Sequence, residues 1–385
     1  MPHPSIHRNR FWSFLSGFPW PFSVKYLFRK SRSLVFFIAR NLFRFSESRG
    51  GPVAGFSVLE GLRAGKQEGK ILWESQPLPE IQPPSVMLEC GMQQEGYQPW
   101  PLFWTRHVRA RLVGPSLCLL DDHKRLMIES AYDNAHYRGD PSYNYICLPP
   151  PLFLKGPWTS IVSRWDYNYY HWFLDALPRL GLLPNFPSDT QILARGPATP
   201  YQRETLAWLG ITDRVHFVEK NHYRVEDYYY SGFTGMTGCL NPWNIRHLRG
   251  LFLGHATANP SSPERFYLIR KGKTRGIKNE EEVQDFFRNR NWAIVDTETM
   301  GVADQIALFS RAKQICSLHG AGLTNLLWCP PGAQVLELFA NNYLNGVYEG
   351  ISLLNHLRYQ YRIFPGDHKH KIFVPLHILA TALDG

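Results

Sequence analysis

Residues Gln314 to Leu338 read QICSLHGAGLTNLLWCPPGAQVLEL. An apolar run leads into His319 and the small residues Gly320, Ala321 and Gly322. A short helical stretch follows, and a second apolar run ends the segment. This order of strand, tight turn, helix and strand predicts a parallel sheet with helices packed on its faces.

The same alternation extends through residues 251–385. Asn279 is expected to cap a helix, with Glu282 three positions later completing a capping box. Because five strand signals alternate with helix signals, this C-terminal part is predicted to be a five-stranded, doubly wound α/β domain. The expected strands are FYLIRK (266–271), WAIVDTE (292–298), QICSLHG (314–320), QVLELF (334–339) and RYQYRIF (358–364).

Residues 51–250 show two patterns. Between about Ser85 and Ser130, short apolar runs alternate with turn residues and predict the strands of a preliminary, β-rich sheet. After the prolines at 149–151, a strand is expected at 159–165 and a helix at 169–183. Further alternation of strand and helix signals predicts a second parallel sheet. The chain is therefore predicted to be an α/β protein with two Rossmann-like domains.

Composition limits the class of protein. Of 385 residues, 44% are hydrophobic and 19% are charged, as in ordinary globular proteins. No apolar window is long enough for a membrane-spanning helix. The six cysteines are widely spaced and indicate neither a zinc site nor a disulfide framework. We therefore expect a cytoplasmic protein with reduced thiols.

The basic charge is concentrated in residues 1–50, which carry nine Lys and Arg against one acid. The rest of the chain is nearly neutral, so no broad nucleic-acid-binding face is expected on the globular part. Because aromatic residues are interleaved with the basic ones, this segment is suited to peripheral contact with the anionic inner face of a membrane. The alternative is a poorly ordered tail or a helix packed on the body. Residues 46–55 read as a linker.

Two loops are expected at one edge of the second sheet. The HGAG turn offers free N–H groups at a helix start, which favours phosphate binding, although it is equally a tight turn packed against a neighbour. Arg270, Lys271, Lys273 and Arg275 leave the first strand. Since parallel strands share one carboxyl edge, this basic loop should lie beside the turn, unless it is simply solvated. Glu337, at the end of the fourth strand, is suited to accept ribose hydroxyls or is an ordinary strand-end acid.

His171 and Asp175 are four residues apart, so on a helix they share a face. A histidine with a carboxylate partner is suited to accept a proton, although such pairs also occur on helix surfaces without a catalytic role. The sequence contains no DxD triplet; Asp121-Asp122-His123 is the nearest approach and is expected in a hairpin. GxGxxG and GxxxxGK[ST] are also absent. No metal site is therefore predicted, and redox dinucleotide or Walker-type chemistry is disfavoured.

Three separated motifs resemble those of glycosyltransferase family 61, and the resemblance covers about Ser160 to Pro365. It implies a two-domain GT-B architecture, with two Rossmann-like domains facing a central cleft. The C-terminal half would bind a nucleotide-sugar donor, usually a uridine diphosphate sugar, and the N-terminal half the acceptor. Inversion at the anomeric carbon is also implied. The motifs are NYYHWFLDALPRL (168–180), RKGKTRGIKNEEEV (270–283) and ADQIALFSRAKQICSLHGAGLTNLLWCPPGAQVLEL (303–338).

The resemblance also implies which residues contact the donor. Gln305 matches an acid-Gln pair of the family, in which Asp304 replaces the commoner Glu. The implied contacts are Arg270 and Arg275 at the diphosphate, Asn279 and Glu280 holding their loop, His319, Gly320, Ala321, Gly322, Thr324 and Asn325 along the pyrophosphate and sugar, and Glu337 at the ribose.

The expected mechanism is a direct displacement without a metal ion or other cofactor. His171 is the predicted base, with Asp175 orienting it and Asp166 as the second choice. Arg270, Arg275 and the helix start would stabilise the leaving diphosphate. The expected acceptor is a glycan or another hydroxyl compound in surface polysaccharide or capsule synthesis. The alternatives are a catalytically inactive nucleotide-sugar-binding protein and a basic scaffold acting through residues 1–50 at nucleic acid or membrane.

Overall fold

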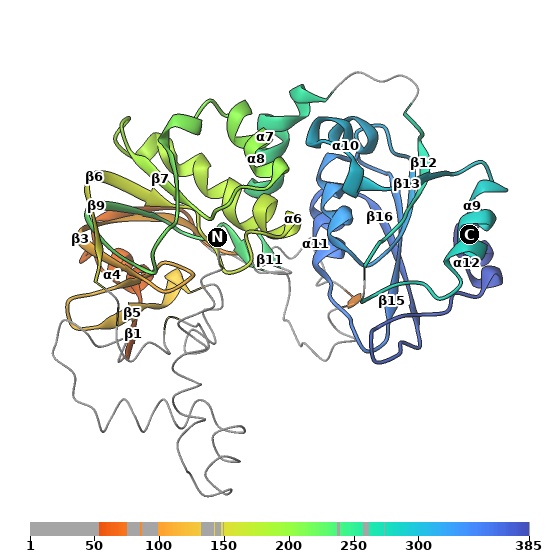
Figure 1. Cartoon of the computed structure of the whole chain (residues 1–385), viewed down its shortest axis with the longest axis horizontal. Helices are drawn as coiled ribbons and strands as arrows, with labels where there is room; N and C mark the ends of the chain where they lie inside the picture. Colours follow the sequence, from red (N-terminus) through yellow and green to blue (C-terminus); the bar gives the residue numbers. More distant parts are fainter. Residues whose placement is uncertain are drawn as a thin grey trace, which may run out of the picture.

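The computed structural model describes most of the chain from residue 54 onward, and its elements fall into two halves, each built on one large sheet (Figure 1). The basic segment 1–50 and Lys273 lie outside the described residues. The described ranges are 54–74, 85–86, 99–131, 142, 148, 150–236, 239–256, 262–272 and 274–384.

The first half is organised by a nine-stranded mixed sheet in the order β1-β5-β4-β3-β9-β6-β7-β8, with β2 paired to β3. Strands β9, β6, β7 and β8 run parallel, whereas β9 is antiparallel to β3. The strands are β1 (Ala54–Phe56), β2 (Gly69–Trp73), β3 (Leu102–Val113), β4 (Cys118–Leu120), β5 (Arg125–Met127), β6 (Leu152–Ser160), β7 (Gln191–Ala194), β8 (Val215–Phe217) and β9 (His222–Ser231), beside a two-stranded sheet of β10 (Gly235–Met236) and β11 (Cys239–Leu240).

This arrangement corrects the prediction for the first half. The sequence predicts a β-rich sheet followed by a separate parallel sheet, but β9 joins them because it pairs with β3 on one side and with β6 on the other. The β9-β6-β7-β8 part and the short β1-β5 pair are parallel, but β2, β3 and β4 pair with their neighbours antiparallel, so a wholly Rossmann-like first domain is wrong. The strand expected at 159–165 is displaced as well, since β6 ends at Ser160 and a loop leads from it to the next helix.

The helix expected at residues 169–183 is present but irregular. It starts after Asn168, whose side chain accepts a hydrogen bond from the backbone N–H of Tyr170 at 2.9 Å. It then widens into one π-helical stretch and continues as a 3-10 helix; π-helical turns are frequent at functional sites. The helical elements of this half are α4 (Val58–Arg63), η1 (Ile128–Ser130), α6 (Tyr169–His171), η4 (Trp172–Ala176), η5 (Leu177–Asn185), α7 (Pro200–Trp208), η6 (Thr212–Arg214), α8 (Pro242–Phe252) and η7 (Leu253–His255).

The second half contains a five-stranded sheet in the order β13-β12-β14-β15-β16, with every neighbouring pair parallel. All five strands predicted from the sequence are confirmed, and so is their parallel direction. The strands are β12 (Arg265–Leu268), β13 (Ala293–Val295), β14 (Gln314–Leu318), β15 (Gln334–Ala340) and β16 (Arg358–Phe364).

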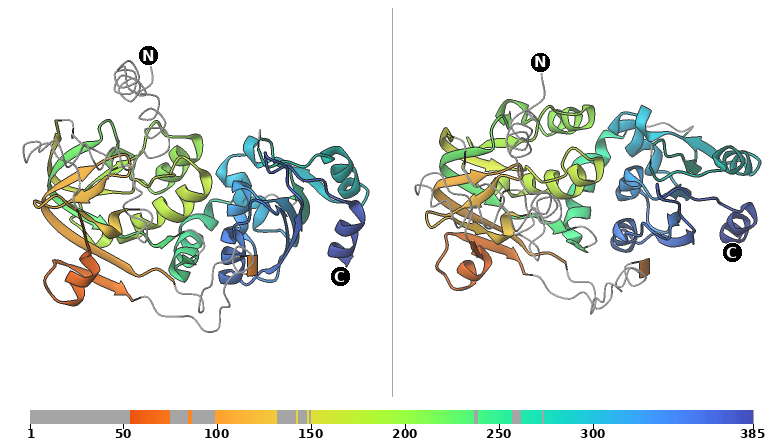
Figure 2. Two further views of the ribbon diagram at one scale, coloured as in Figure 1. Left: turned by 90° about the horizontal axis from the view of Figure 1, so that it is seen from below. Right: turned by 60° about the horizontal axis from the view of Figure 1, so that its bottom comes forward.

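Helices cover both faces of this sheet (Figures 1 and 2). On the face toward the first half, α10, η9 and α11 pack with α6 and η4 in one hydrophobic core, where Phe173 meets Trp328 edge-on at 5.9 Å between ring centroids. On the other face, α9 and α12 cover a separate core around Phe287. The helical elements are α9 (Glu280–Arg288), η8 (Thr297–Thr299), α10 (Val302–Phe309), η9 (Ala321–Trp328), α11 (Val347–Leu354) and α12 (Leu376–Asp384).

The strand order places a topological switch point between β12 and β14. After β12 the chain turns outward to β13, whereas β14, β15 and β16 follow one another on the other side. Leu268 at the end of β12 pairs with Ser317 near the end of β14, so the loops that leave these two strands start side by side. Doubly wound sheets bind their ligands outside the carboxyl ends of the strands at such a point.

Polar side chains join the two halves. The Tyr169 hydroxyl of α6 donates a hydrogen bond to Asn325 Oδ1 of η9 at 3.0 Å. The carboxylate of Glu204 in α7 accepts from the backbone N–H groups of Val302 and Ala303 at 2.9 and 3.1 Å. Glu204 therefore caps the start of α10 across the boundary, where a negative charge is favourable.

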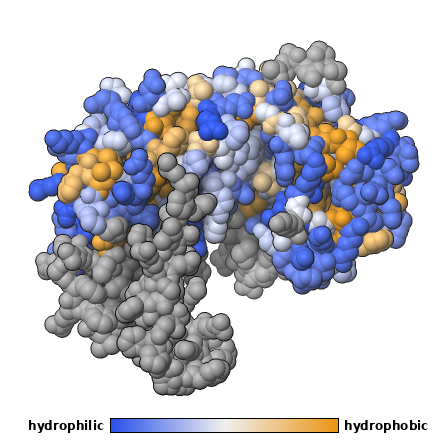
Figure 3. Space-filling model, in the orientation of Figure 1, coloured by the Kyte–Doolittle hydropathy of each residue, from blue (hydrophilic) through white to orange (hydrophobic). Residues whose placement is uncertain are grey.

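Within the described ranges, no helix is both long and apolar enough to cross a membrane. In the view of Figure 3, hydrophobic residues gather in separate patches on both halves, and hydrophilic residues border each patch. Membrane contact through residues 1–50 falls outside the described residues and stays a prediction.

Candidate functional site

Two arginines of the loop after β12 lie together at the carboxyl edge of the second sheet. Arg270 Nε donates a hydrogen bond to the carbonyl oxygen of Arg275 at 3.1 Å. Arg275 has a φ of 57°, a left-handed conformation that is unfavourable for a residue with a Cβ. Its N–H donates to the carbonyl of Lys369 at 2.8 Å. Such a strained position persists only where surrounding contacts hold it, and strain of this kind often marks functional sites.

The segment before α12 holds the arginine loop from the other side. Ile372 N–H donates to the carbonyl of Gly276 at 3.0 Å. Asn279 and the backbone of Val374 exchange two hydrogen bonds, each 3.0 Å long. Asn279 is the N-cap residue of α9, as predicted, but the capping box is wrong: the buried side chain makes no N-cap bond, and its amide is bonded to Val374 and to Glu282 Oε2 at 3.3 Å. The Asn279 side chain therefore ties the start of α9 to the segment before α12.

Glu280, the second residue expected to hold this loop, ties the start of α9 to β12. Its carboxylate accepts hydrogen bonds from the Tyr267 hydroxyl at 3.2 Å and from Gln284 Nε2 at 3.1 Å. Burial raises the pKa of Glu280. Its contacts are with the framework beneath the loop and not with either arginine.

Glycines in the turn after β14 allow the arginine loop to approach closely. A Cβ placed on Gly320 would lie 2.4 Å from Arg270 Nη1, and one on Gly322 would lie 2.9 Å from a methyl carbon of Leu268. Neither position accommodates a side chain without displacement of its neighbour. The expected closeness of the two loops is therefore confirmed, and it depends on the absence of side chains at both glycines.

The helix after this turn is a 3-10 helix, η9, and Asn325 braces it from inside. Asn325 is fully buried, and its Oδ1 accepts from the Tyr169 hydroxyl and from Trp328 Nε1, both at 3.0 Å. Its Nδ2 donates to Gln305 Oε1 at 2.7 Å and to the carbonyl of Gly322 at 3.0 Å. All its polar atoms are engaged inside the protein, so this geometry does not support the direct donor contact predicted for Asn325. Thr324 is buried as well.

A buried carboxylate orients His319. Nδ1 of His319 lies 2.6 Å from Glu337 Oε1, and the hydroxyl of Tyr359 donates to the other carboxylate oxygen. Glu337 is 0% exposed, and burial raises its pKa. Because both oxygens are bonded inside the protein, the structure assigns Glu337 to positioning His319 and does not support the predicted ribose contact.

Aromatic residues that the sequence reasoning missed surround His319. The ring centroids of Phe339, Tyr348 and Tyr343 lie 5.1, 5.0 and 5.7 Å from that of His319. The guanidinium of Arg275 lies 4.6 Å from the centre of the Tyr343 ring, within reach of a cation–π interaction. The sequence position of Tyr343 could have indicated this, because Tyr343 follows β15 and parallel strands place the residues after them at the same carboxyl edge as both loops.

The two arginines have no ion-pair partner in the part of the chain that the structure describes. Among the described residues, no carboxylate lies within 4.0 Å of either guanidinium, whereas the neighbouring Lys271 and Lys278 have partners at 2.6 Å (Asp296) and 3.4 Å. Burial, and secondarily the charge of Arg275, lowers the pKa of Arg270. Partly buried cations without a counter-ion raise the free energy of the folded protein, so this position favours a bound anion.

The predicted His171–Asp175 pair is formed. Nδ1 of His171 lies 2.6 Å from Asp175 Oδ2, and the side chains are 19% and 0% exposed. Asp175 belongs to the π-helical stretch η4, and His171 is the last residue of α6. A buried carboxylate therefore holds a partly exposed imidazole in one orientation, as a general base requires.

Rings connect the two histidines across the boundary between the halves. Tyr170 packs edge-on against His171 at 5.1 Å and against Tyr348 at 5.8 Å, and Tyr348 lies 5.0 Å from His319, all between ring centroids. The predicted base and the turn after β14 thus belong to one continuous group of side chains.

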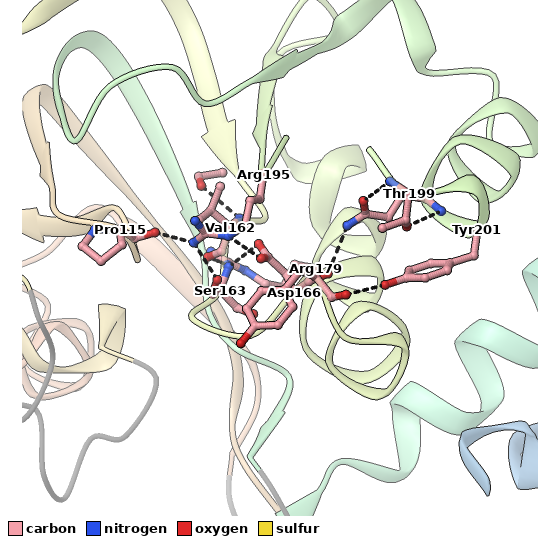
Figure 4. A network of polar contacts seen from close by, with 11 residues as sticks. Pro115, Val162, Ser163, Asp166, Arg179, Arg195, Thr199 and Tyr201 are labelled. Carbon is pink, nitrogen blue, oxygen red and sulfur yellow. Dashed lines mark hydrogen bonds and ion pairs between the residues drawn. The ribbon is translucent and has the colours of Figure 1, made fainter. Parts of the chain in front are cut away.

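Asp166, the second choice of base, has a structural role. It is 1% exposed, and its carboxylate is bonded to Arg195 Nε at 2.5 Å and to the backbone N–H of Ser163 at 2.9 Å (Figure 4). Burial raises its pKa in spite of the charge of Arg195. With both oxygens engaged in the interior, Asp166 has no carboxylate oxygen to offer to an acceptor.

Within the described ranges, no group of three or more His, Cys, Asp and Glu residues could hold a metal ion. Asp121 lies in the turn between β4 and β5, which confirms the predicted hairpin. Its carboxylate pairs with Arg125 Nε at 2.8 Å. The nearest approach to a DxD triplet is therefore a surface turn on the sheet of the first half.

Comparison with known families gives a match to the central part of the chain. The family described as Glycosyltransferase 61 matches residues 169–336. This range contains the His171–Asp175 pair, the arginine loop and the turn at His319, and the match supports a transferase activity of the glycosyltransferase class. The match supports the assignment of residues 169–336 to glycosyltransferase family 61. No curated protein matches the chain.

Proposed function

We propose that the protein is an inverting GT-B glycosyltransferase that transfers a sugar from a uridine diphosphate sugar to a hydroxyl acceptor, in the synthesis of a surface polysaccharide or another glycan. The observation that carries this proposal is the pair Arg270 and Arg275. They lie at the switch point of a parallel sheet, beside His319, and lack a carboxylate partner among the described residues. A diphosphate supplies the missing negative charge.

The donor would bind with its diphosphate against the arginine loop. Charge-assisted hydrogen bonds from guanidinium groups to phosphate contribute roughly 1.5–3 kcal/mol each. Gly320 leaves room for Arg270 at the turn, and the first N–H groups of η9 have no partner within the helix. His319, held by Glu337, would place its second ring nitrogen toward the same anion.

Transfer would proceed by one displacement at the anomeric carbon. His171 accepts the proton of the acceptor hydroxyl while the hydroxyl oxygen forms a bond to the anomeric carbon. The bond from that carbon to the diphosphate oxygen breaks on the opposite face, so the configuration inverts. Arg270 and Arg275 stabilise the negative charge of the leaving diphosphate. The arginines take the role that a divalent ion has in other transferases, so the proposed reaction proceeds without a metal.

A nucleotide-release screen tests this function. The full chain is incubated with a panel of nucleotide sugars and simple hydroxyl acceptors, with and without EDTA, and the free nucleotide is measured. We expect uridine diphosphate to be released from one donor at the same rate in both conditions, with the opposite anomeric configuration in the product. Binding of uridine diphosphate without release from any donor would instead identify an inactive binding protein, and loss of activity in EDTA would contradict metal independence.

A further inference from the structure

The loop between β6 and α6 exposes two neighbouring aromatic side chains. Trp165 is 39% exposed and Tyr167 is 56% exposed. Their ring centroids lie 6.0 Å apart at an interplanar angle of 64°, and the guanidinium of Arg164 lies 5.0 Å from the Trp165 ring. Large exposed aromatic groups that contact each other are more informative than single exposed ones, because adjacent groups of this kind mark binding surfaces.

Hydrogen bonds and an ion pair fix the backbone of the loop that carries these rings. Asp166, between them, is buried and bonded to Arg195 and to the Ser163 N–H, and its carbonyl accepts from Gln202 Nε2 at 3.0 Å. Figure 4 shows this network, in which Tyr201 also reaches the loop. The Tyr201 hydroxyl donates to the carbonyl of Tyr167 at 2.7 Å.

The remaining contacts continue this pattern. The N–H of Asn168 donates to the carbonyl of Trp165 at 2.8 Å, which closes the turn, and the Asn168 side chain then caps α6. The backbone is therefore fixed while the two side chains that it presents stay exposed. A rigid loop that presents aromatic rings binds a ligand at low entropic cost, because little has to be ordered on binding.

The loop is followed directly by α6, which contains the predicted base His171. Asn168 caps the helical turn that contains His171, so Trp165 and Tyr167 lie on the same short, fixed segment as the residue that would take the acceptor proton. A ligand on these rings would belong to the acceptor side of the reaction, since the arginine loop that receives the donor is in the other half.

We propose that Trp165 and Tyr167 form an aromatic platform that binds a sugar ring of a saccharide acceptor; this inference rests on the proposed glycosyltransferase function. One face of a pyranose presents only C–H bonds, which carry a small positive charge and match the negative face of an aromatic ring. Arg164 beside Trp165 supplies donors for the hydroxyl groups at the ring edge.

The test compares transfer to a saccharide with transfer to water and to a peptide. Wild type, Trp165→Ala, Tyr167→Ala and the double variant are assayed for uridine diphosphate release in the presence of p-nitrophenyl glycosides, of a serine- and threonine-containing peptide, or of buffer alone. Phe153→Ala is the matched control. Phe153 is an aromatic residue that is 69% exposed, and it lies near the start of β6, whereas the loop follows the end of that strand. Trp165→Phe and Tyr167→Phe keep a ring at each position.

We expect each alanine variant to raise KM for the glycoside about tenfold, and the double variant more, while release in buffer alone, donor affinity and melting temperature stay at wild-type values. The phenylalanine variants and Phe153→Ala should behave like wild type. Unchanged glycoside kinetics in the double variant, or transfer to the peptide alone, would overturn the platform while leaving the proposed function intact. Absence of nucleotide release from any donor under any condition would remove the proposed function, and the platform with it.

Discussion

Replacement of Arg275 by alanine is expected to lower kcat/KM about 10²- to 10³-fold with the fold intact. The guanidinium lies beside Arg270, against the ring of Tyr343, and no carboxylate among the described residues neutralises it. Loss of one preorganised group that stabilises the charge of a transition state costs about 3–4 kcal/mol. Alanine and arginine both carry a Cβ, so a φ of 57° is equally unfavourable for either residue. The substitution therefore removes the charge without adding backbone strain.

Nucleotide release, measured beside thermal unfolding, checks this prediction. Arg311→Ala is the matched control, because Arg311 is an exposed arginine of the same half that precedes β14 and thus lies at the opposite edge of the sheet. Arg275→Lys should recover only part of the rate, since an ammonium keeps the charge but not the planar, two-pronged donor geometry. Wild-type kinetics in a folded Arg275→Ala protein would exclude Arg275 from the diphosphate site.

Replacement of His171 by alanine is expected to lower kcat about 10²- to 10⁴-fold, the usual contribution of a general base, with little change in donor affinity. The donor site is built from the other half, so uridine diphosphate binding should not depend on the imidazole. Asp175→Asn should also lower kcat, because the bond between Asp175 Oδ2 and His171 Nδ1, 2.6 Å long, fixes the orientation of the ring. Both effects should appear in kcat rather than in the KM for the donor.

His255→Ala serves as the control for this experiment. His255 is an exposed histidine stacked on Trp208 at 4.4 Å between ring centroids, in the same half as His171. Its removal should leave transfer unchanged. If single-turnover measurements gave equal rates for wild type and His171→Ala, the base would have to be another group.

The second half of the fold could be read from the sequence, because its signals are local. Each strand is a short apolar run with its own turn and helix, and parallel direction follows from the alternation. That direction alone predicts that the loops after β12 and β14 meet, as Arg270 and Gly320 do. The His171–Asp175 contact was also predictable, since it needs only the spacing of one helical turn.

The rest depends on contacts between distant parts of the chain. β9 pairs with β3, which lies more than one hundred residues earlier in the chain. The sequence of neither strand indicates which other strand it pairs with. The same holds for the Asn279 side chain, which pairs with Val374 and makes no N-cap bond, and for Glu337, whose partners are His319 directly after β14 and Tyr359 in β16. The spacing of residues along the chain shows where a polar residue lies at the start or end of a helix or strand. It does not show which distant group that residue is hydrogen-bonded to.

Calorimetric titration of the protein with uridine diphosphate and with uridine, both in EDTA, tests the central claim most directly. Because the two ligands differ only in the diphosphate, their difference in affinity measures what the arginine loop contributes. The account predicts that wild type prefers the diphosphate by at least about 10²-fold and that the Arg270→Ala/Arg275→Ala double variant loses most of this preference. A preference that survives in the double variant, or one that appears only with a divalent cation, would contradict it.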